Sequence, residues 1–253
     1  MSKKAIVVGD LHIGARNASM VVCNNQLRLF EEVVFPYMKK HKIEHIIQTG
    51  DLFDTRKFSN HVILKEWKDR FFDHLPGTLH VILGNHDIAT KNSVKINTPE
   101  LLLNEYIEKD LVKVYSFPEQ VKFGKLDILM VPWICLENHM ECETMMEQTS
   151  ADWCVGHFEI DGFEMHRGQV HSGGMTSELF KSFDQVISGH FHTKSESKNI
   201  SYIGTPYEMT WVDYDDPKGF YVLDTQKRTM EFIRNTFTLF NKFNISGITG
   251  KEL

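Results

Sequence analysis

The chain has 253 residues, of which 42% are hydrophobic and 25% are charged, so its composition is that of an ordinary folded protein with room for one large core. The formal net charge of −6 argues against a protein that holds nucleic acid by overall positive charge. The four cysteines form no Cys-x-x-Cys pair, the N-terminus has no signal-peptide pattern, and no apolar run approaches the roughly 20 residues that span a membrane, which predicts a soluble cytoplasmic protein with no membrane partner.

Strand-like and helix-like stretches alternate over the first 110 residues. Runs rich in Ile and Val predict strands at residues 5–8, 45–48 and 79–83, and helical spacing predicts helices at 25–40 and 60–74. These connections are long enough for parallel crossovers, which is typical of an α/β fold. Thr98-Pro99-Glu100 has the pattern of an N-cap followed by proline, and it predicts a third helix toward Lys109.

After residue 110 the strand signals come closer together. Strands are predicted at 111–114, 120–123 and 126–131, and the turn at Gly124-Lys125 indicates a meander or hairpin. The pattern then predicts a helix at 136–148, a strand at 152–155, a short helix at 177–183, a strand at 185–188, and antiparallel strands at 200–203, 220–224 and 229–233. We expect one domain over residues 1–234 and a C-terminal tail or linker stub over residues 235–253.

Five apolar runs end in glycine followed by a side chain that can bind a metal. The motifs are Val8-Gly9-Asp10, Thr49-Gly50-Asp51, Leu83-Gly84-Asn85, Val155-Gly156-His157 and Ser188-Gly189-His190. Ligands in open α/β sheets gather beyond the carboxyl ends of the strands, and glycine there permits a tight turn and a close backbone approach. Five strand ends could therefore meet at one site.

The spacing and chemistry of these side chains predict two metal ions. Asp10 and His12 are two residues apart, as are His190 and His192, and residues two apart in an extended chain face the same way. The donors are carboxylate, imidazole and amide without thiolate, which suits Mn²⁺, Fe or Zn²⁺. The candidate ligands, too many for a single ion, are Asp10, His12, Asp51, Asn85, His157, His190 and His192.

His86 and Asp87 directly follow Asn85 and are candidate catalytic residues. Two metals about 3.5–4 Å apart can activate a water molecule and neutralise charge on the phosphate and leaving oxygens. His86 would then donate a proton, and Asp87 is the partner expected to fix its tautomer and orientation. These residues predict hydrolysis of a phosphoester.

The ordered motifs Asp-x-His, Gly-Asp-x-x-Asp, Gly-Asn-His-Asp, Gly-His and Gly-His-x-His resemble those of the calcineurin-like metallophosphoesterases. The resemblance runs from Asp10 to His192 and implies a sandwich of two mixed β-sheets flanked by helices. It also implies the role of each candidate: one ion held by Asp10, His12 and His192, the other by Asn85, His157 and His190, Asp51 binding both, and His86 acting as the acid.

A narrower resemblance is to the SbcD-type DNA repair nucleases, and within them to the recombination endonuclease subunits of T-even-type bacteriophages. It rests on Gly-Asp-Leu-Phe-Asp-Thr-Arg-Lys from Gly50, Val-Pro-Trp from Val131, Val-Gly-His-Phe-Glu from Val155, and the segment from Ser188 to Pro206. It implies exonuclease or endonuclease activity on DNA in recombination and repair, with Mn²⁺ as the metal and Mg²⁺ as an alternative. It further implies a homodimer formed through the helices after the second and third motifs, and an SMC-like ATPase partner. A phage-encoded chain of this kind would act in the host cell cytoplasm.

Two features depart from the cellular members of that family. Asp54 stands where those members usually have a histidine. Full-length relatives continue into a DNA-capping domain and an ATPase-docking helix, which we expect to be absent here because few residues follow Asn235. Six basic residues on loops near the motifs could contact DNA phosphates or could be solvated surface charges: Arg16, Arg56, Lys57, Lys91, Lys95 and Arg167.

Two other functions stay open from the sequence. The same kind of metal site serves phosphodiesterases and phosphatases that act on nucleotides or phosphoproteins. Thr55 and Arg56 after Asp54, and Asp87 in place of glutamate, argue against a phosphoprotein phosphatase. The chain could also be a noncatalytic scaffold for an ATPase, but the complete ligand set and His86 argue against this, because a scaffold needs no proton donor.

Overall fold

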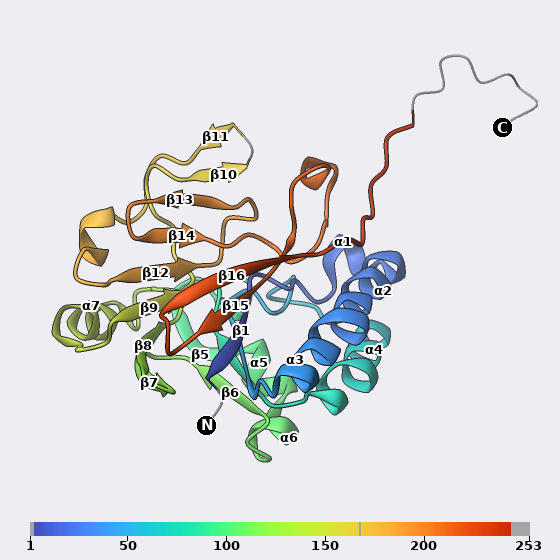
Figure 1. The fold of residues 1–253 in the computed structure, drawn as a ribbon, viewed down its shortest axis with the longest axis horizontal. Coiled ribbons are helices and arrows are strands. Elements are labelled where there is room, and N and C mark those ends of the chain that lie inside the picture. Colours follow the sequence, from blue (N-terminus) through green and yellow to red (C-terminus); the bar gives the residue numbers. More distant parts are fainter. Residues whose placement is uncertain (1–2, 167, 244–253) are drawn as a thin grey trace, which may run out of the picture.

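Two six-stranded β-sheets pack face to face, and helices cover their outer faces (Figure 1). The computed structural model describes residues 3–166 and 168–243. None of the helices in these residues combines the length and the apolar character that a membrane span requires. The predicted α/β class and the sandwich of two mixed sheets are confirmed.

The first sheet has the strand order β16-β15-β1-β2-β3-β6. β1, β2, β3 and β6 run parallel, β15 pairs antiparallel with β1, and β16 pairs antiparallel with β15 at the edge of the sheet. The carboxyl ends of β1, β2 and β3 therefore lie at the same edge of the sheet. The strands are β1 (Lys4–Val8), β2 (His45–Gln48), β3 (Thr78–Ile82), β6 (Val112–Tyr115), β15 (Gly219–Asp224) and β16 (Thr229–Arg234).

The second sheet has the strand order β13-β14-β12-β9-β8-β7. Its four central strands run parallel, and β7 and β13 are antiparallel edges. β9 and β12 thus end side by side. The strands are β7 (Glu119–Phe123), β8 (Leu126–Val131), β9 (Trp153–Gly156), β12 (Gln185–Ser188), β13 (Ser195–Ser197) and β14 (Ile200–Tyr202).

The central strands face two different cores. Successive residues of a strand point to opposite faces, so Ala5 and Val7 of β1 pack between the sheets, whereas Ile6 and Val8 pack against the helices outside. All four side chains are buried. A strand buried on both faces has no polar face, which explains why the sequence shows continuous apolar runs rather than alternation.

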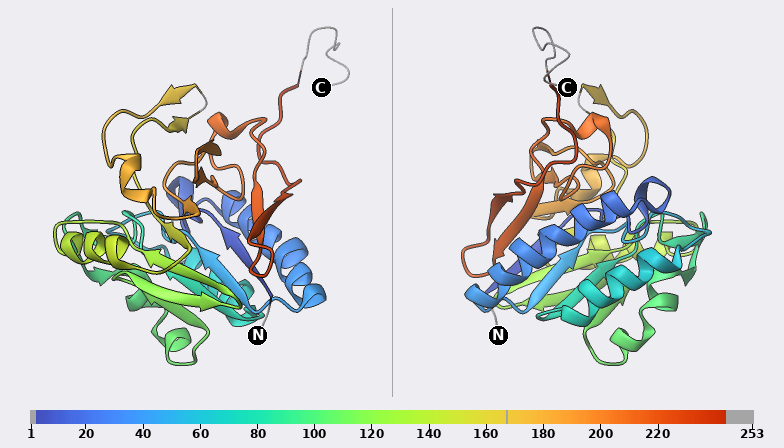
Figure 2. Two further views of the ribbon diagram at one scale, coloured as in Figure 1. Left: turned by 60° about the vertical axis from the view of Figure 1, so that its left-hand side comes forward. Right: turned by 90° about the vertical axis from the view of Figure 1, so that its right-hand side faces the viewer.

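A long helical segment and a second helix cover the first sheet. The segment consists of α1 (Ala15–Ala18), α2 (Met20–Leu29), the π-helical turn η1 (Phe30–Val34) and α3 (Phe35–His41), and the second helix is α4 (His61–Arg70) followed by η2 (Phe72–His74). α2 and α4 lie side by side (Figure 2, right). Between them, the Phe30 ring lies 4.7 Å from that of Phe71 and 6.0 Å from that of Trp67, centroid to centroid.

Shorter elements complete the structure. The outer face of the second sheet packs against α7 (His139–Gln148) and η3 (Ser177–Phe180). Two small hairpins lie outside the main sheets, one between β3 and β6 and one between β9 and β12. The remaining elements are β4 (Ile88–Thr90), β5 (Ser93–Asn97), α5 (Thr98–Leu102), α6 (Asn104–Ile107), β10 (Glu164–His166), β11 (Gln169–Val170) and η4 (Trp211–Asp213).

The structure corrects three predicted details. β6 pairs parallel with β3 in the first sheet, so it forms no meander with β7 and β8, which make a hairpin in the second sheet. β14 is parallel to β12, not antiparallel as predicted for residues 200–203, because β13 reverses the chain direction between them. Asn97 rather than Thr98 is the N-cap of α5, since its side chain accepts the N–H of Glu100.

The chain after β16 packs back onto the protein as far as it is described. The Asn235 side chain donates to the carbonyl of Pro206 at 3.0 Å. The Glu208 carboxylate accepts the N–H groups of Leu239 and Phe240 at 2.6 and 3.0 Å. The first residues beyond position 234 are therefore bound to the loop that follows β14.

Trp67 tests the packing of α4 against the first sheet. Trp67→Ala removes a fully buried side chain from the cluster with Phe30 and Phe71, and we expect it to lower the free energy of unfolding by about 3–5 kcal/mol. His61→Ala on the same helix changes an exposed side chain, and it should cost less than about 0.5 kcal/mol. Guanidinium denaturation of both variants measures the difference, and similar midpoints would contradict this account of the core.

Candidate metal centre

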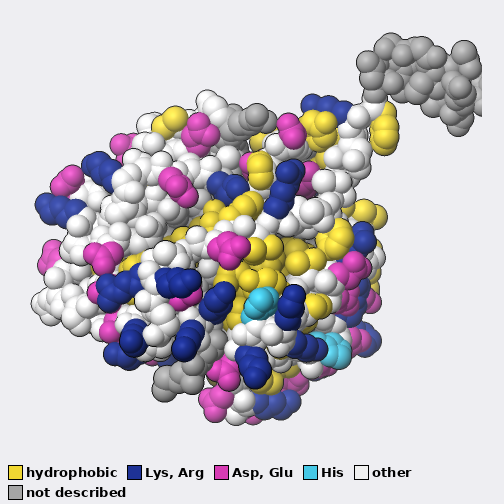
Figure 3. All heavy atoms as spheres, in the orientation of Figure 1, with side chains coloured by type: hydrophobic (Ala, Val, Ile, Leu, Met, Phe, Trp, Pro, Cys, Tyr) yellow, Lys and Arg dark blue, Asp and Glu magenta, His cyan; other side chains and the backbone are white. Residues whose placement is uncertain are grey.

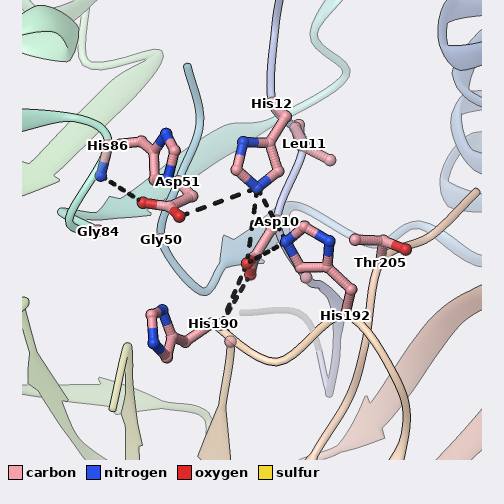
Figure 4. Close-up of polar contacts among 12 residues, drawn as sticks. Asp10, Leu11, His12, Gly50, Asp51, Gly84, His86, His190, His192 and Thr205 are labelled. Atoms are coloured by element: carbon pink, nitrogen blue, oxygen red, sulfur yellow. Dashed lines mark hydrogen bonds and ion pairs between the residues drawn. The ribbon is translucent and has the colours of Figure 1, made fainter. Parts of the chain in front are cut away.

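Five loops bring the predicted site residues together at one end of the sandwich. They follow β1, β2 and β3 of the first sheet and β9 and β12 of the second. Because the two sheets face each other with their parallel strands ending at the same side, the loops meet across the gap (Figure 4). The seven candidate ligands lie in this cluster, and all except Asn85, His190 and His192 are buried.

One group of donor atoms consists of Asp10, His12 and His192. His12 Nε2 lies 3.1 Å from His192 Nε2 and 3.9 Å from Asp10 Oδ2, and His192 Nε2 lies 3.7 Å from Asp10 Oδ2. Figure 4 shows His12 Nε2 facing Asp10, His192 and Asp51 at once.

A second group consists of Asn85, His157 and His190. Asn85 Oδ1 lies 3.1 Å from His157 Nε2 and 3.1 Å from His190 Nδ1. His157 Nδ1 donates to the carbonyl of Thr49 at 2.9 Å, which leaves Nε2 without a proton in the neutral ring. The hydrogen bond behind the ring therefore presents a lone pair toward Asn85 and His190.

Asp51 lies between the two groups. Its Oδ2 is 3.8 Å from His12 Nε2 in the first group and 3.4 Å from His157 Nε2 in the second. Its Oδ1 accepts the N–H of His86 at 2.7 Å. Burial alone would raise the pKa of Asp51, but the neighbouring imidazoles of His157 and His12 lower it far below the usual range, so this carboxylate is charged.

The arrangement of these donors fits a pair of divalent cations. Within each group, lone pairs of imidazole, carboxylate and amide converge on the same small volume, where they repel one another unless a proton or a cation lies between them. Burial would lower the pKa of His157, yet the carboxylates of Asp51 and Asp10 raise it to about 9. At neutral pH this pKa means that the metal-free His157 ring carries an extra proton. A divalent cation would neutralise the same carboxylates and displace that proton from His157.

Three of the converging residues have strained backbones. His12, Asp51 and His190 have φ angles of 46°, 55° and 84°, in the left-handed region that side-chain-bearing residues rarely adopt. Each such residue costs on the order of 1–3 kcal/mol. Hydrogen bonds hold them there, since His12 N donates to the Asp51 carbonyl at 3.0 Å and His190 N donates to the Asp10 carboxylate at 3.1 Å.

Two motif glycines are needed because other residues lie too close for a side chain. A Cβ at Gly84 would lie 2.2 Å from both the backbone N and Oδ1 of Asp51. A Cβ at Gly50, which also has φ +106°, would lie 2.2 Å from Nδ1 of His157. Glycine therefore lets these loops contact one another at the distance that the donor cluster requires.

The structure changes the predicted partner of His86. His86 Nδ1 donates to the carbonyl of Asp54 at 2.5 Å. The Asp87 carboxylate instead accepts three backbone N–H groups, from Leu52, Phe53 and Gly84, at 3.2, 2.9 and 2.9 Å. The expectation that Asp87 orients His86 is thus wrong, because the buried Asp87 side chain points to the loop behind it.

Asp54 contacts the site in a second way. Its Oδ1 lies 3.3 Å from His12 Nδ1, on the side of the ring away from His192. The carboxylate can accept the Nδ1 proton of His12 and leave its Nε2 free. Asp54 therefore contacts both His12, through its carboxylate, and His86, through its backbone carbonyl.

Five of the six basic residues proposed for DNA contact can be placed. Arg16, Lys57 and Lys91 are exposed, and Lys95 is exposed and paired with Glu137 at 3.0 Å. Arg56 is partly buried and its Nε donates to the carbonyl of Asn85 at 2.6 Å, so it braces the third motif. The sixth, Arg167, lies outside the described residues.

Comparison with known proteins identifies the family. The chain matches the calcineurin-like phosphoesterases over residues 3–194. It belongs to that family. Exonuclease subunit 1 of Enterobacteria phage T4 is 38% identical over 237 residues, which are 93% of this chain and 68% of that protein.

Two further relatives are similar over most of this calcineurin-like phosphoesterase. A subunit of the nuclease SbcCD from Staphylococcus saprophyticus subsp. saprophyticus is 24% identical over 91% of this chain and 68% of its own length. The DNA double-strand break repair protein Mre11 of Sulfurisphaera tokodaii is 27% identical over 77% of this chain and 50% of its own length. This chain therefore spans between half and about two thirds of these relatives.

Several residues that support the phosphoesterase site were not predicted from the sequence. Tyr207 is fully buried and its hydroxyl donates to the carbonyl of Leu11 at 2.6 Å, between Asp10 and His12. Lys218 is also buried, and its Nζ donates to the carbonyl of His192 at 2.7 Å. Both come from the segment after the last motif, where the sequence signal is only that Gly204-Thr205-Pro206 belongs to the narrower resemblance.

Lys218 is held by two carboxylates as well. Its Nζ lies 2.8 Å from Asp213 Oδ1 and 2.8 Å from Asp216 Oδ2. Burial would raise the pKa of Asp213, but the Lys218 charge lowers it below the usual value, so the Asp213 carboxylate is charged. A buried lysine with acidic partners can thus fix the backbone of a metal-site loop without leaving its own positive charge uncompensated.

Asp87→Asn tests the brace behind the site. The amide would leave at least one of three buried backbone N–H groups without an acceptor, which should lower the free energy of unfolding of the metal-free protein by about 1–3 kcal/mol. It should also reduce the rise in melting temperature on addition of Mn²⁺, because the loops of Asp51 and Asn85 lose their common acceptor. Asp69→Asn, at an exposed ion pair, is the control and should change neither quantity measurably. An unchanged Mn²⁺ response in Asp87→Asn would remove Asp87 from the positioning of the site.

Proposed function

We propose that this phosphoesterase is a two-metal nuclease that hydrolyses phosphodiester bonds of DNA, as an exonuclease, an endonuclease or both, in recombination or repair. The observation that carries the proposal is the position of Asp51, whose one carboxylate oxygen lies within 4 Å of ligand atoms of both groups. Sites that hold two metals around a shared carboxylate are typical of phosphate-ester hydrolysis. The nuclease names of two relatives, and the DNA-repair name of the third, support DNA as the substrate.

The proposed division of roles follows the two groups of donors. Asp10, His12 and His192 would hold one ion, Asn85, His157 and His190 the other, and Asp51 both. The ions would supply a nucleophilic water at neutral pH and charge neutralisation at the phosphate. Carboxylate, imidazole and amide donors without thiolate favour Mn²⁺, and Mg²⁺, Fe or Zn²⁺ are the alternatives.

His86 is the proposed general acid. A ring nitrogen of His86 belongs to a group with ligand atoms of His12 and Asp51 in which all atoms lie within 4.8 Å of one another. The hydrogen bond from Nδ1 to the Asp54 carbonyl fixes the ring, so a protonated Nε2 can give its proton to the leaving oxygen. Asp87 has no part in this step, and we propose that it positions Asp51 and Asn85 instead.

His86→Ala is the decisive variant for the proposed reaction. With Mn²⁺, the unaltered protein should shorten labelled linear DNA, and His86→Ala should lower the rate by a factor on the order of 10²–10⁴ while keeping its Mn²⁺-induced rise in melting temperature. His74→Ala, at an exposed histidine away from the site, should cleave like the unaltered protein. Product ladders from single-stranded, duplex and hairpin DNA report polarity and end preference together.

Two outcomes of this assay would favour other functions. Hydrolysis of small phosphate monoesters or phosphopeptides with no cleavage of any DNA would replace the nuclease by a phosphatase. Absence of any Mn²⁺-induced stabilisation would favour a noncatalytic scaffold.

We further propose that the chain forms a homodimer and works with an SMC-like ATPase. We also propose that residues 1–234 are the catalytic domain and residues 235–253 a tail or linker.

Support for the dimer comes from exposed apolar side chains on and beside α4 and α5. Phe58 is 81% exposed, Val62 60% and Leu101 68%. A hollow between these helices is lined by apolar residues of both, including Leu64 and Leu102, and by charged residues such as Lys65, Lys68 and Glu105. Apolar side chains concentrated on one surface are typical of protein contacts.

Introducing negative charge into the proposed contact tests whether the chain forms a dimer through this surface. Val62→Asp combined with Leu101→Asp would place two carboxylates in an apolar symmetric contact, so sedimentation velocity should show a shift from dimer to monomer. Met140→Asp is the matched control, because Met140 on α7 is 81% exposed but lies on the other sheet. A protein that is monomeric without any substitution, or a dimer that survives both aspartates, would contradict this surface.

A further inference from the structure

A cavity of about 330 Å³ lies directly beside the second group of metal-binding donors. His157 of that group forms part of its wall, and Trp133, Ile134, Phe158 and Leu179 supply apolar surface. The volume is at the lower end of the range for ligand pockets. It suits a single ring system attached to a group at the metal centre better than a long chain.

Trp133 connects the cavity to the metal centre. Its ring centroid lies 5.3 Å from that of His190 at a tilt of 46°, and 6.0 Å from that of His157. The ring is partly exposed, and the backbone N–H donates to the carbonyl of Leu83 at 2.7 Å, which fixes this residue after β8. A planar group in the cavity would contact Trp133 while a phosphate attached to it reaches the donors of His157 and His190.

The charges around the cavity indicate which part of a nucleotide fits. Glu143 and Glu159 line it, and among the described lining residues none is lysine or arginine. His139 pairs with Glu143 at 3.1 Å, and His171 pairs with Glu159 at 3.2 Å. Carboxylates repel a second phosphate, but they accept hydrogen bonds from the amino groups of nucleobases. The wall therefore disfavours the DNA backbone and favours an uncharged base.

We propose that this cavity binds the nucleobase of the nucleotide whose phosphate is held at the metal centre, with Trp133 as the stacking surface and Glu143 and Glu159 as acceptors for amino groups. This inference rests on the proposed function and adds a subsite to it. A base in the cavity cannot be paired or stacked in a duplex, so the site takes an unpaired nucleotide, such as one at a frayed end or in a single strand. Cytosine and adenine have amino donors that thymine lacks, so they bind more tightly.

Calorimetric titration of the full chain with Mn²⁺ tests the subsite directly. The ligands are 2′-deoxycytidine 5′-phosphate, thymidine 5′-phosphate and the base-free 2-deoxyribose 5-phosphate. We expect tightest binding for the cytidine nucleotide and weakest for the base-free compound. Trp133→Ala should reduce the preference for a nucleotide over the base-free compound by on the order of tenfold or more, because base-aromatic stacking is lost, and Trp133→Phe should keep most of it.

Two further variants separate the subsite from general damage. Glu143→Gln, at a partly exposed position of α7, should reduce the preference for cytosine over thymine severalfold without touching the contact between Trp133 and His190. Leu136→Ala is the matched control, because Leu136 is 81% exposed, lies shortly after Trp133 in the chain and does not line the cavity. It should leave both preferences as they are in the unaltered protein.

Hydrolysis gives a second, independent readout. The ratio of kcat/KM for the p-nitrophenyl ester of thymidine 5′-phosphate to that for methyl p-nitrophenyl phosphate, a phosphodiester that has no base, should be well above one and should fall in Trp133→Ala. Equal binding of nucleotide and base-free compound by the unaltered protein, or unchanged preferences in both Trp133 variants, would overturn the subsite. Base-dependent binding without cleavage of DNA or either ester would overturn the proposed nuclease and leave the base subsite standing. Cleavage of DNA without any base preference would overturn the subsite and leave the nuclease standing.

Discussion

The arrangement of the site depends on one carboxylate, that of Asp51, held between two sets of imidazole donors. It can take this position only because β2 ends next to β1 and β3 in one sheet and opposite β9 and β12 of the other. Asp51 Oδ1 is occupied by the N–H of His86, so Oδ2 alone is directed toward both His12 and His157. The sandwich therefore provides what a single sheet cannot, since ligands from two layers surround the shared oxygen.

Such a site is costly in the metal-free chain, and the surrounding hydrogen bonds offset that cost. Asp51 itself is in the left-handed region and is buried beside other charged groups. The supporting contacts come from behind each loop: Asp87 for the second and third motifs, Tyr207 for the first, and Lys218 for the last. These groups are buried and lie outside the cluster of donor atoms, which makes the loops rigid where the donors converge. A cation would then relieve repulsion in a geometry that is already formed.

Much of this metal centre could be predicted from the sequence because each ligand lies within a short motif that is recognisable by itself. The pattern of an apolar run, a glycine and a donor places each ligand at a strand end, and the structure brings those ends together. Contacts between motifs could not be predicted in the same way. Asp87 follows His86 in sequence yet binds the N–H groups of Leu52 and Phe53, which belong to the second motif and are far from Asp87 in the sequence. The place of β6 in the first sheet could not be predicted for a similar reason, since strand partners depend on the path between strands and not on the strand itself.

The charge distribution explains how an acidic chain could still act on a polyanion. On the face shown in Figure 3, basic and acidic side chains are interspersed and form no single basic patch, in keeping with the net charge of −6. Two divalent cations around Asp51 would add four positive charges at one point, so attraction for phosphate would be concentrated there and would depend on the metal. The cavity beside His157 has the opposite sign, with Glu143 and Glu159 in its wall. A nucleotide that places its phosphate at the cations and its base against these carboxylates has favourable electrostatic interactions at both places. In the reverse orientation the carboxylates would repel the phosphate, and the cations would have no anion to bind. Metal and carboxylates together would thus orient the substrate without a basic groove.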